Sequence, residues 1–208
     1  MATTSITTGD TTASGTTDGR SLRAARTREA VVEALLSLND EGNLRPTARE
    51  IADRAGVSLR SVYVHFEDLE DLFSAAAAKQ FERLVTLYEP LPTDGPLPDR
   101  LDAFVSQRAR IMEAAAPVRR AALLQEPFSP ALAQVMALTR KAGRDEIERV
   151  FVTELERERG AAGERLRASL DVAAGPGTWE TLRVHDGLSV EQARLVVTEM
   201  LTKLLASG

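Results

Sequence analysis

Side chains suited to binding a nucleic acid are concentrated in one short stretch, TAREIADRAGVSLRSVYVHF, which runs from Thr47 to Phe66. Hydroxyl, guanidinium, phenol and imidazole groups can all hydrogen-bond to phosphate oxygens, and several of them can also contact base edges. The candidate contact residues are Thr47, Ser58, Leu59, Arg60, Ser61, Tyr63 and His65. The chemistry that this stretch predicts is non-covalent recognition of double-stranded DNA.

Two short helices joined by a tight turn would position these side chains. Thr47 and Glu50 form a capping box, and Pro46 prevents the helix from extending backwards. Gly56 can take the left-handed conformation that ends a helix, and Ser58 can cap the next one. The pattern predicts a helix-turn-helix, in which the second helix enters the major groove.

The spacing of apolar residues separates an inner from an outer side of the second helix. Val57, Val62 and Phe66 are expected to point inward, which leaves Leu59, Arg60, Ser61, Tyr63, Val64 and His65 on or near the outward side. Helix–Gly–helix patterns are also common inside ordinary bundles, so that alternative stays open. Flanking helices favour the DNA-binding interpretation: one has its apolar residues at positions 31, 34, 35 and 38 and ends at Gly42, and another begins near Leu69.

Residues from about Arg26 to Lys79 resemble the N-terminal domain of the TetR family of transcriptional regulators. The matching residues are Glu29, Val31, Ala34, Leu35, Leu38, Gly42, Thr47, Glu50, Ile51, Ala52, Ala55, Gly56, Val57, Ser58, Tyr63, His65, Phe66 and Leu72. The resemblance implies an all-α fold, in which a three-helix helix-turn-helix domain is joined to a C-terminal helical bundle for ligand binding and dimerisation. It also implies a homodimer that represses genes and releases a palindromic operator when a small ligand binds.

The resemblance assigns roles to individual positions. Thr47 and Ser58 would contact phosphates at the helix N-termini, and Tyr63 and His65 match positions that usually hold the DNA backbone. The readout of bases is an inference from chemistry: Arg60 can reach a guanine edge, and Leu59 can press on a thymine methyl group.

Two features depart from the family pattern. Val64 stands where relatives often have an aromatic residue or His, and Leu69 replaces a common Lys. Four acids surround this second position: Glu67, Asp68, Glu70 and Asp71. They suit a helix N-terminus but repel phosphates, so we expect a modest DNA affinity that falls with salt.

Positive charge is gathered before and within the helix-turn-helix. The segment 20–66 holds eight arginines, no lysine and six acids, a net charge of +2, whereas the whole chain carries −5. Arg20, Arg23, Arg26 and Arg28 are interpreted as an arm or helix end along the DNA backbone or in the minor groove. The alternative is a solvated helix start.

Composition limits the remaining classes. The chain has 208 residues, no cysteine and no apolar run near the roughly 20 residues of a membrane span. No secretory signal is evident, so a cytoplasmic protein without membrane association is expected. Residues 1–19 are predicted to be a disordered tail rich in Thr, Ser and Gly. Residues 20–88 would form the DNA-binding domain with its connecting fourth helix, and 89–208 the ligand-binding and dimerisation domain.

The C-terminal part is expected to be a set of helices separated by Pro and Gly. After the break EPLPTDGPLP, a helix from Leu97 should end near Pro117, where VRRAALLQE begins. Long helices are predicted over 130–159, 164–185 and 189–206. The last two resemble the family's dimerising helices, since apolar residues nearly encircle the final one. The candidate interface residues are Trp179, Leu182, Val190, Val197, Met200, Leu201 and Leu204; burial within one chain is the alternative.

A small-molecule pocket is expected between helices of the C-terminal part. The candidate lining residues are Phe104, Met112, Leu123, Phe128, Met136, Arg140 and Trp179. Plain core packing is the alternative for the apolar residues. Arg140 with Lys141 would either pair an anionic ligand or form a solvated basic face.

Enzyme chemistry has little support in the sequence. No phosphate-binding glycine loop, nucleophile elbow or H-E-x-x-H motif occurs. His185 before Gly187 suits the C-terminal end of a helix, although a metal ligand or base is the alternative reading. We therefore expect no catalytic residues, no metal and no cofactor. A ligand-insensitive DNA-binding or scaffolding protein remains the alternative function.

Overall fold

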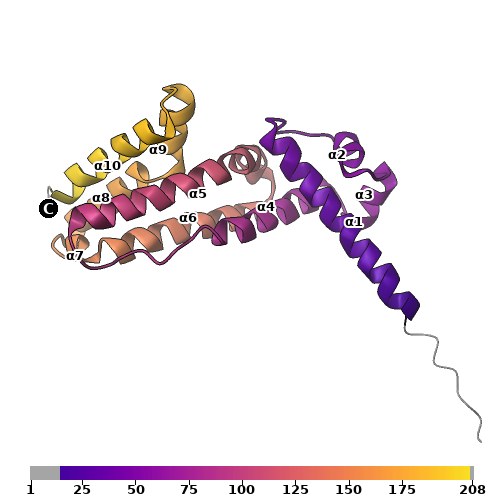
Figure 1. Cartoon of the computed structure of the whole chain (residues 1–208), viewed down its shortest axis with the longest axis horizontal. Helices are drawn as coiled ribbons and strands as arrows, with labels where there is room; N and C mark the ends of the chain where they lie inside the picture. The colour runs from indigo at the N-terminus through magenta and orange to yellow at the C-terminus, as the bar shows by residue number, and fades with distance from the viewer. Residues whose placement is uncertain (1–14, 207–208) are drawn as a thin grey trace, which may run out of the picture.

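The computed structural model describes residues 15–206, and within that range every regular element is helical (Figure 1). This confirms the all-α prediction. The elements are α1 (Gly15–Asp40), α2 (Ala48–Ala55), α3 (Leu59–His65), α4 (Leu69–Val85), α5 (Leu97–Gln125), η1 (Glu126–Phe128), α6 (Pro130–Val150), α7 (Val152–Leu155), α8 (Gly160–Ala173), α9 (Pro176–Glu180), a π-helical segment η2 (Thr181–His185) and α10 (Val190–Ala206). None of the helices in 15–206 is long and apolar enough to cross a bilayer.

The N-terminal helices enclose their own hydrophobic core. Helices α1 to α4 surround buried side chains that include Leu35, Ile51, Val62, Phe66 and Leu72. Figure 1 shows α2 and α3 on one side of the long α1, with α4 leading towards the rest of the chain. The predicted three-helix domain with a fourth, connecting helix is therefore the observed fold.

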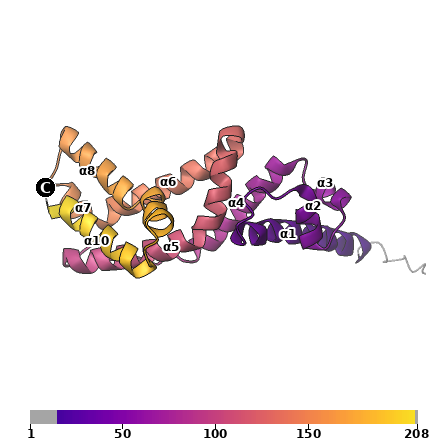
Figure 2. The ribbon, with the colours of Figure 1, turned by 90° about the horizontal axis from the view of Figure 1, so that it is seen from above.

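The C-terminal helices enclose a second and larger core. Its buried side chains come from α5, α6, α7, α8, α9, η2 and α10. Phe104 and Phe151 meet edge to face at its centre, with ring centroids 5.1 Å apart. Figures 1 and 2 show α8 and α10 lying along α5 and α6 at the end of the molecule far from α3.

Two contacts join these cores. Ala77 of α4 packs in a small cluster with Ala122, Leu132 and Met136 of α5 and α6. Val118 of α5 contributes directly to the N-terminal core. The division expected after residue 88 is therefore crossed by contacts, and a displacement of α5 near Val118 would disturb the packing of the N-terminal helices.

Helix α5 continues through Pro117, contrary to the prediction that it would end there. A proline inside a helix lacks an N–H and displaces carbonyls in the preceding turn. Gln80 of α4 donates its side-chain amide to the Ala114 carbonyl at 2.8 Å, which fixes the preceding turn of α5 against α4. The last part of α5 turns away from the first part (Figure 2).

Three other expected boundaries were wrong. The long helix over 130–159 breaks at Phe151, whose fully buried ring packs in the core. The helix over 164–185 is interrupted at Gly175 and Pro176, because proline starts the short α9. The first helix begins at Gly15, so residues 15–19 are helical, whereas residues 1–14 of the expected tail lie outside the described range.

Candidate nucleic-acid interface and ligand cavity

The start of α2 has the predicted capping box. The Glu50 N–H donates to the Thr47 hydroxyl at 3.3 Å, and the Thr47 N–H donates to Glu50 Oε2 at 2.7 Å. Hydrogen bonds from the side chain and backbone of Thr47 lower the pKa of Glu50. Thr47 is exposed, but its hydroxyl also donates to Glu50 Oε2 at 2.7 Å. A phosphate contact from Thr47 would therefore compete with Glu50.

The turn and the cap of α3 fix the direction of the second helix. Gly56 has φ = 67°, a conformation that favours glycine, and its neighbour Val57 donates its N–H to the Ala52 carbonyl. Ser58 then caps α3: its hydroxyl accepts from the Ser61 N–H at 3.1 Å. The two serine hydroxyls also lie 2.8 Å apart. These local bonds hold α3 at a defined angle to α2.

Helix α3 presents the predicted polar side to solvent. Val62 and Phe66 are buried, whereas Leu59, Arg60 and Tyr63 are exposed, Tyr63 by 52%. Ser61 and His65 are partly buried. The seven predicted contact residues thus lie on α3 and at the two caps, and the assignment of each to a base or a phosphate stays a prediction.

Most arginines near this surface carry unneutralised charge. Among the eight arginines of 20–66, only Arg54 forms an ion pair with another described residue, Glu41, at 2.6 Å. Arg28 lies over the Phe66 ring, with its guanidinium carbon 4.7 Å from the centroid. Arg45, Arg49 and Arg60 are exposed; the first two lie at the start of α2 and were not singled out in the sequence, although their charge was counted there.

The acids after Phe66 have a structural role. Asp68 caps α4, with Oδ1 accepting from the Asp71 N–H at 2.9 Å. Asp71 in turn accepts weakly from the Glu67 N–H at 3.4 Å. These bonds explain why carboxylates occupy this position, and their charge remains on the surface beside α3.

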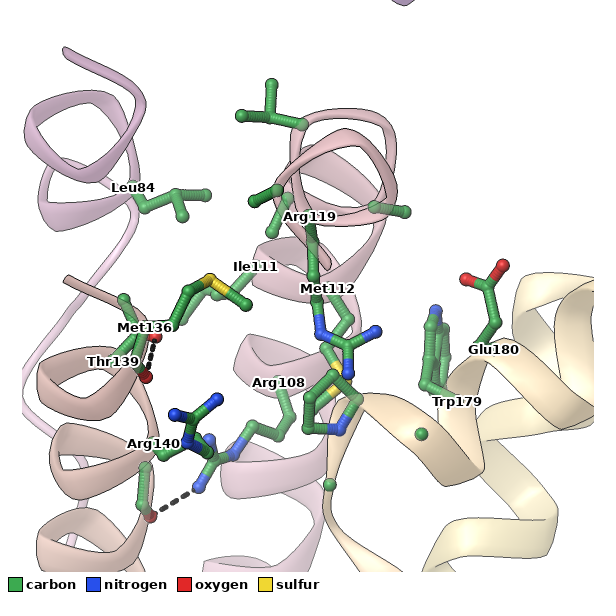
Figure 3. A pocket seen from close by; sticks show the side chains of 18 of the residues that line it. Leu84, Arg108, Ile111, Met112, Arg119, Met136, Thr139, Arg140, Trp179 and Glu180 are labelled. Carbon is green, nitrogen blue, oxygen red and sulfur yellow. Dashed lines mark hydrogen bonds between the residues drawn. The ribbon is translucent and has the colours of Figure 1, made fainter. Parts of the chain in front are cut away.

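A cavity of about 700 Å³ lies in the C-terminal part. Its walls come from α4, α5, α6 and the segment from the end of α8 to the start of η2 (Figure 3). Four of the predicted lining residues are on the wall: Met112, Met136, Arg140 and Trp179. A volume of this size is typical of small-molecule sites.

Three predicted lining residues do not line the cavity. Phe104 is fully buried in the core against Phe151, while Leu123 and Phe128 are exposed elsewhere, Phe128 beside a separate shallow crevice. Their helical spacing was compatible with either role. Tertiary packing decides whether such a residue lies in the core or on the cavity wall, and the spacing of residues along one helix does not reveal that packing.

Sequence reasoning also missed wall residues. Arg108 lines the cavity four residues after Phe104 and four before Met112, and this spacing was a usable signal for a buried charge. Arg119 of α5 and Phe81 and Leu84 of α4 also line the cavity. No local signal marked these three, because α4 had been assigned wholly to the DNA-binding domain.

Buried ion pairs tie the C-terminal helices together. Arg100 donates to both carboxylate oxygens of Glu154 and to the Val150 carbonyl, and both charged side chains are 4% exposed. Burial alone would raise the pKa of Glu154, but the hydrogen bonds and charge of Arg100 outweigh it and lower that pKa. Arg108 lies 3.6 Å from Glu146 and donates to the Gly143 carbonyl at 2.7 Å.

The predicted interface residues divide into two groups. Val197 and Leu201 face the core of their own chain, and Trp179 is buried with its indole N–H bonded to Glu113, so these three were wrongly assigned to a partner surface. Leu182 is also buried in the core of its own chain. Met200 is 37% exposed, and Val190 and Leu204 are partly buried. Val196, Met200 and Leu204, at i, i+4 and i+8, form an apolar stripe of α10, in which Val196 and Leu204 also pack against the chain's own core and Met200 is exposed.

The helix-turn-helix domain is similar to a known protein family. Residues 31–76 match the family model described as bacterial regulatory proteins, tetR family. The matched segment contains α2 and α3 and the buried residues around them. No curated protein sequence matches the chain.

Solved structures share the fold along nearly the whole chain. A transcriptional regulator from Rhodococcus sp. Rha1 is 19% identical with a TM-score of 0.68, covering 86% of this chain and 96% of that one. A TetR transcription regulator from Haloarcula marismortui is 19% identical with a TM-score of 0.66, over 86% and 98%. A putative TetR-family regulator from Mesorhizobium loti is 18% identical with a TM-score of 0.56, over 89% and 98%.

The matched segment and the fold together define the class: the protein has an N-terminal helix-turn-helix domain joined to an all-helical C-terminal domain. The helix-turn-helix segment, residues 31–76, is similar to the TetR family of bacterial regulatory proteins.

Proposed function

We propose that this protein is a cytoplasmic homodimer that represses transcription from a palindromic operator and leaves it when a small ligand binds. The observation that supports this most strongly is the outward side of α3, where Arg60 and Tyr63 are exposed on the segment that matches the family. Arg60 would read a guanine edge and Leu59 a thymine methyl group. Tyr63, His65, Ser58 and Ser61 would hold phosphates, with Thr47 at the edge of the contact.

The stripe of Val196, Met200 and Leu204 supports the homodimer. Such a stripe on a terminal helix favours a second copy, which would cover it with the same residues. Two reading helices about 34–36 Å apart would then match a palindrome. The spacing of the two helices becomes the quantity that a ligand can change.

Helix α4 provides a direct route from the cavity to the DNA-binding helices. Its first half contributes Leu72 and Ala76 to the N-terminal core, and its second half places Phe81 and Leu84 on the cavity wall. Lys79 pairs with Glu29 of α1 at 3.2 Å, and Arg83 pairs with Glu33. A shift of α4 would therefore move α1 and the whole reading domain.

A ligand acts through its difference in affinity for two states. In our proposal it binds more tightly when α4 is displaced and the reading helices are too far apart for successive grooves. A ligand that fits both states equally would fill the cavity and leave the DNA bound.

A mobility-shift assay against the DNA that flanks the protein's own gene tests the proposal. We expect a shift that survives excess non-specific competitor and weakens with salt. Equal displacement by specific and non-specific DNA would contradict the proposal. The variant Ala115→Phe, which narrows the cavity, should keep DNA binding and lose release by any ligand that releases the unmodified protein.

A further inference from the structure

The cavity wall combines an apolar lining with several charges. Phe81, Leu84, Ile111, Met112 and Met136 give it carbon-rich surfaces on three helices. A ligand that fills this space must bury apolar groups. The charges then decide which polar group the ligand can carry.

Four charged residues on the wall already have partners of opposite charge. Arg108 faces Glu146 at 3.6 Å, and Arg140 binds Glu126 at 2.8 Å. Glu180 binds Arg120 at 2.7 Å, and Asp171 faces Arg144 at 3.7 Å. These groups are neutralised within the protein and offer little to a charged ligand.

Arg119 differs from the other four. It is partly buried on the wall, and no hydrogen bond or ion pair joins it to another residue of the described chain. Figure 3 shows its side chain descending from α5, with the guanidinium on the same side of the helix as Met112 and Trp179. A guanidinium partly buried among apolar groups, with no carboxylate bonded to it, is costly unless an anion accompanies it.

The electrostatic surroundings agree with this geometry. Burial lowers the pKa of the Arg119 guanidinium; the charges of Glu180 and Glu126 oppose that effect, and the positive charge of Arg140 adds to it. Arginine stays protonated in proteins, so the site keeps a positive charge that is incompletely compensated. A carboxylate matches its planar pair of donors with two parallel hydrogen bonds.

We propose that the cavity binds an apolar organic molecule carrying one carboxylate, and that Arg119 holds the carboxylate. This inference rests on the proposed role of the cavity as an effector site, and it adds the chemical class of the effector. The apolar body would lie against Phe81, Leu84 and Met136. The carboxylate would lie near Trp179.

Trp179 is the chain's single tryptophan, so its fluorescence reports binding directly. The full-length protein is titrated, below micelle-forming concentrations, with octanoate, decanoate, dodecanoate and naphthoate. Decanol and decylamine serve as neutral and cationic probes of matched length. We expect saturable fluorescence changes with at least one carboxylate, and much weaker binding of the alcohol and the amine.

Two substitutions of Arg119 test whether its positive charge holds the carboxylate. Arg119→Gln should weaken carboxylate binding about ten- to a hundredfold and leave alcohol binding unchanged, while Arg119→Lys should retain part of the affinity. Arg110→Gln is the matched control, because Arg110 is on the same helix but exposed, paired with Glu89 and away from the wall. It should bind carboxylates normally.

Several outcomes would overturn the inference. One is that none of the carboxylates binds; another is that decanol binds the unmodified protein as tightly as decanoate. A third is that folded Arg119→Gln keeps full carboxylate affinity. If Arg119→Gln does not fold, the affinities of the unmodified protein for the acid, the alcohol and the amine still test whether the cavity prefers a carboxylate. The DNA assay uses no ligand, so failed DNA binding contradicts the proposed function while carboxylate binding still tests this inference.

Discussion

The two ends of the molecule use arginine in opposite ways. In segment 20–66, seven of eight arginines form no ion pair within the described chain, and Arg45, Arg49 and Arg60 are exposed. In the C-terminal part, Arg100 and Arg108 are buried against glutamates. The first arrangement leaves positive charge available for phosphates, and the second uses it to join helices.

This contrast predicts that substitutions of the two kinds of arginine change different properties, DNA binding in one case and folding stability in the other. Removing an exposed arginine from the DNA-binding domain should change DNA affinity and leave folding almost untouched. Removing a buried one should reduce stability strongly, because a glutamate is then left buried without a partner. Arg119 belongs to neither group, and for that reason it is the candidate for ligand binding.

Disrupting the α10 stripe should have the largest effect. Met200→Glu places a charge on the stripe of Val196, Met200 and Leu204, and should convert the dimer to monomer in light scattering. Loss of the second reading helix should weaken operator binding about 10²–10⁴-fold. Thr202→Glu, at an exposed position of the same helix, is the control. A Met200→Glu protein that stays dimeric would show that the interface lies elsewhere.

The variant Arg100→Met should lower the free energy of unfolding by about 3–5 kcal/mol, because Glu154 would be left buried and unpaired. Urea unfolding followed by circular dichroism measures it. Arg83→Met, which removes the more exposed pair with Glu33, should cost only about 0–1 kcal/mol. Equal losses of unfolding free energy in Arg100→Met and Arg83→Met would show that the buried arginine contributes no more to stability than the exposed one.

Acid should weaken the same buried pair. The pKa of Glu154 is lowered in the folded protein, so its contribution is complete above the ordinary glutamate value of about 4.3 and is lost as pH falls through the lowered value. The double variant Arg100→Met/Glu154→Leu lacks this contribution. As pH decreases over that range, the free energy of unfolding of the double variant should fall less steeply than that of the unmodified protein. Parallel plots of unfolding free energy against pH for the two proteins would contradict the role given to Glu154.

Arg60→Ala should weaken specific binding by about 1–3 kcal/mol and relax the preference at one base pair in each half-site. Stability should change little, since Arg60 is exposed and forms no ion pair with a described residue. Binding curves for operators with single base changes provide the measurement. An unchanged sequence preference would mean that Arg60 does not read a base.

Tyr63→Phe should have the smallest effect, roughly 0.5–1.5 kcal/mol for one lost hydrogen bond. Because we assign Tyr63 to the DNA backbone, the loss should be the same for operator and unrelated DNA. Affinities for both duplexes at matched salt give the comparison. A loss confined to the operator would move Tyr63 to base readout.

The sequence predicted the helix-turn-helix well because its determinants are local. The Thr47–Glu50 box, Gly56 and the Ser58 cap each act within five residues, and the structure has all of them. Pro117 was misjudged because α5 packs there against α4, as the bond from Gln80 to Ala114 shows, and that packing joins residues far apart in sequence. The cavity was predicted only in part for the same reason: its walls come from four separate segments whose packing no local pattern encodes.

The central claim is that paired copies of α3 read a palindromic sequence, and selection of bound duplexes from a random pool tests it most directly. The account predicts enrichment of a two-fold symmetric sequence with half-sites about one helical turn apart. It also predicts that Arg60→Ala loses the preference at one symmetric pair of positions. Absence of enrichment, or a lone asymmetric site bound equally well by Arg60→Ala, would contradict it.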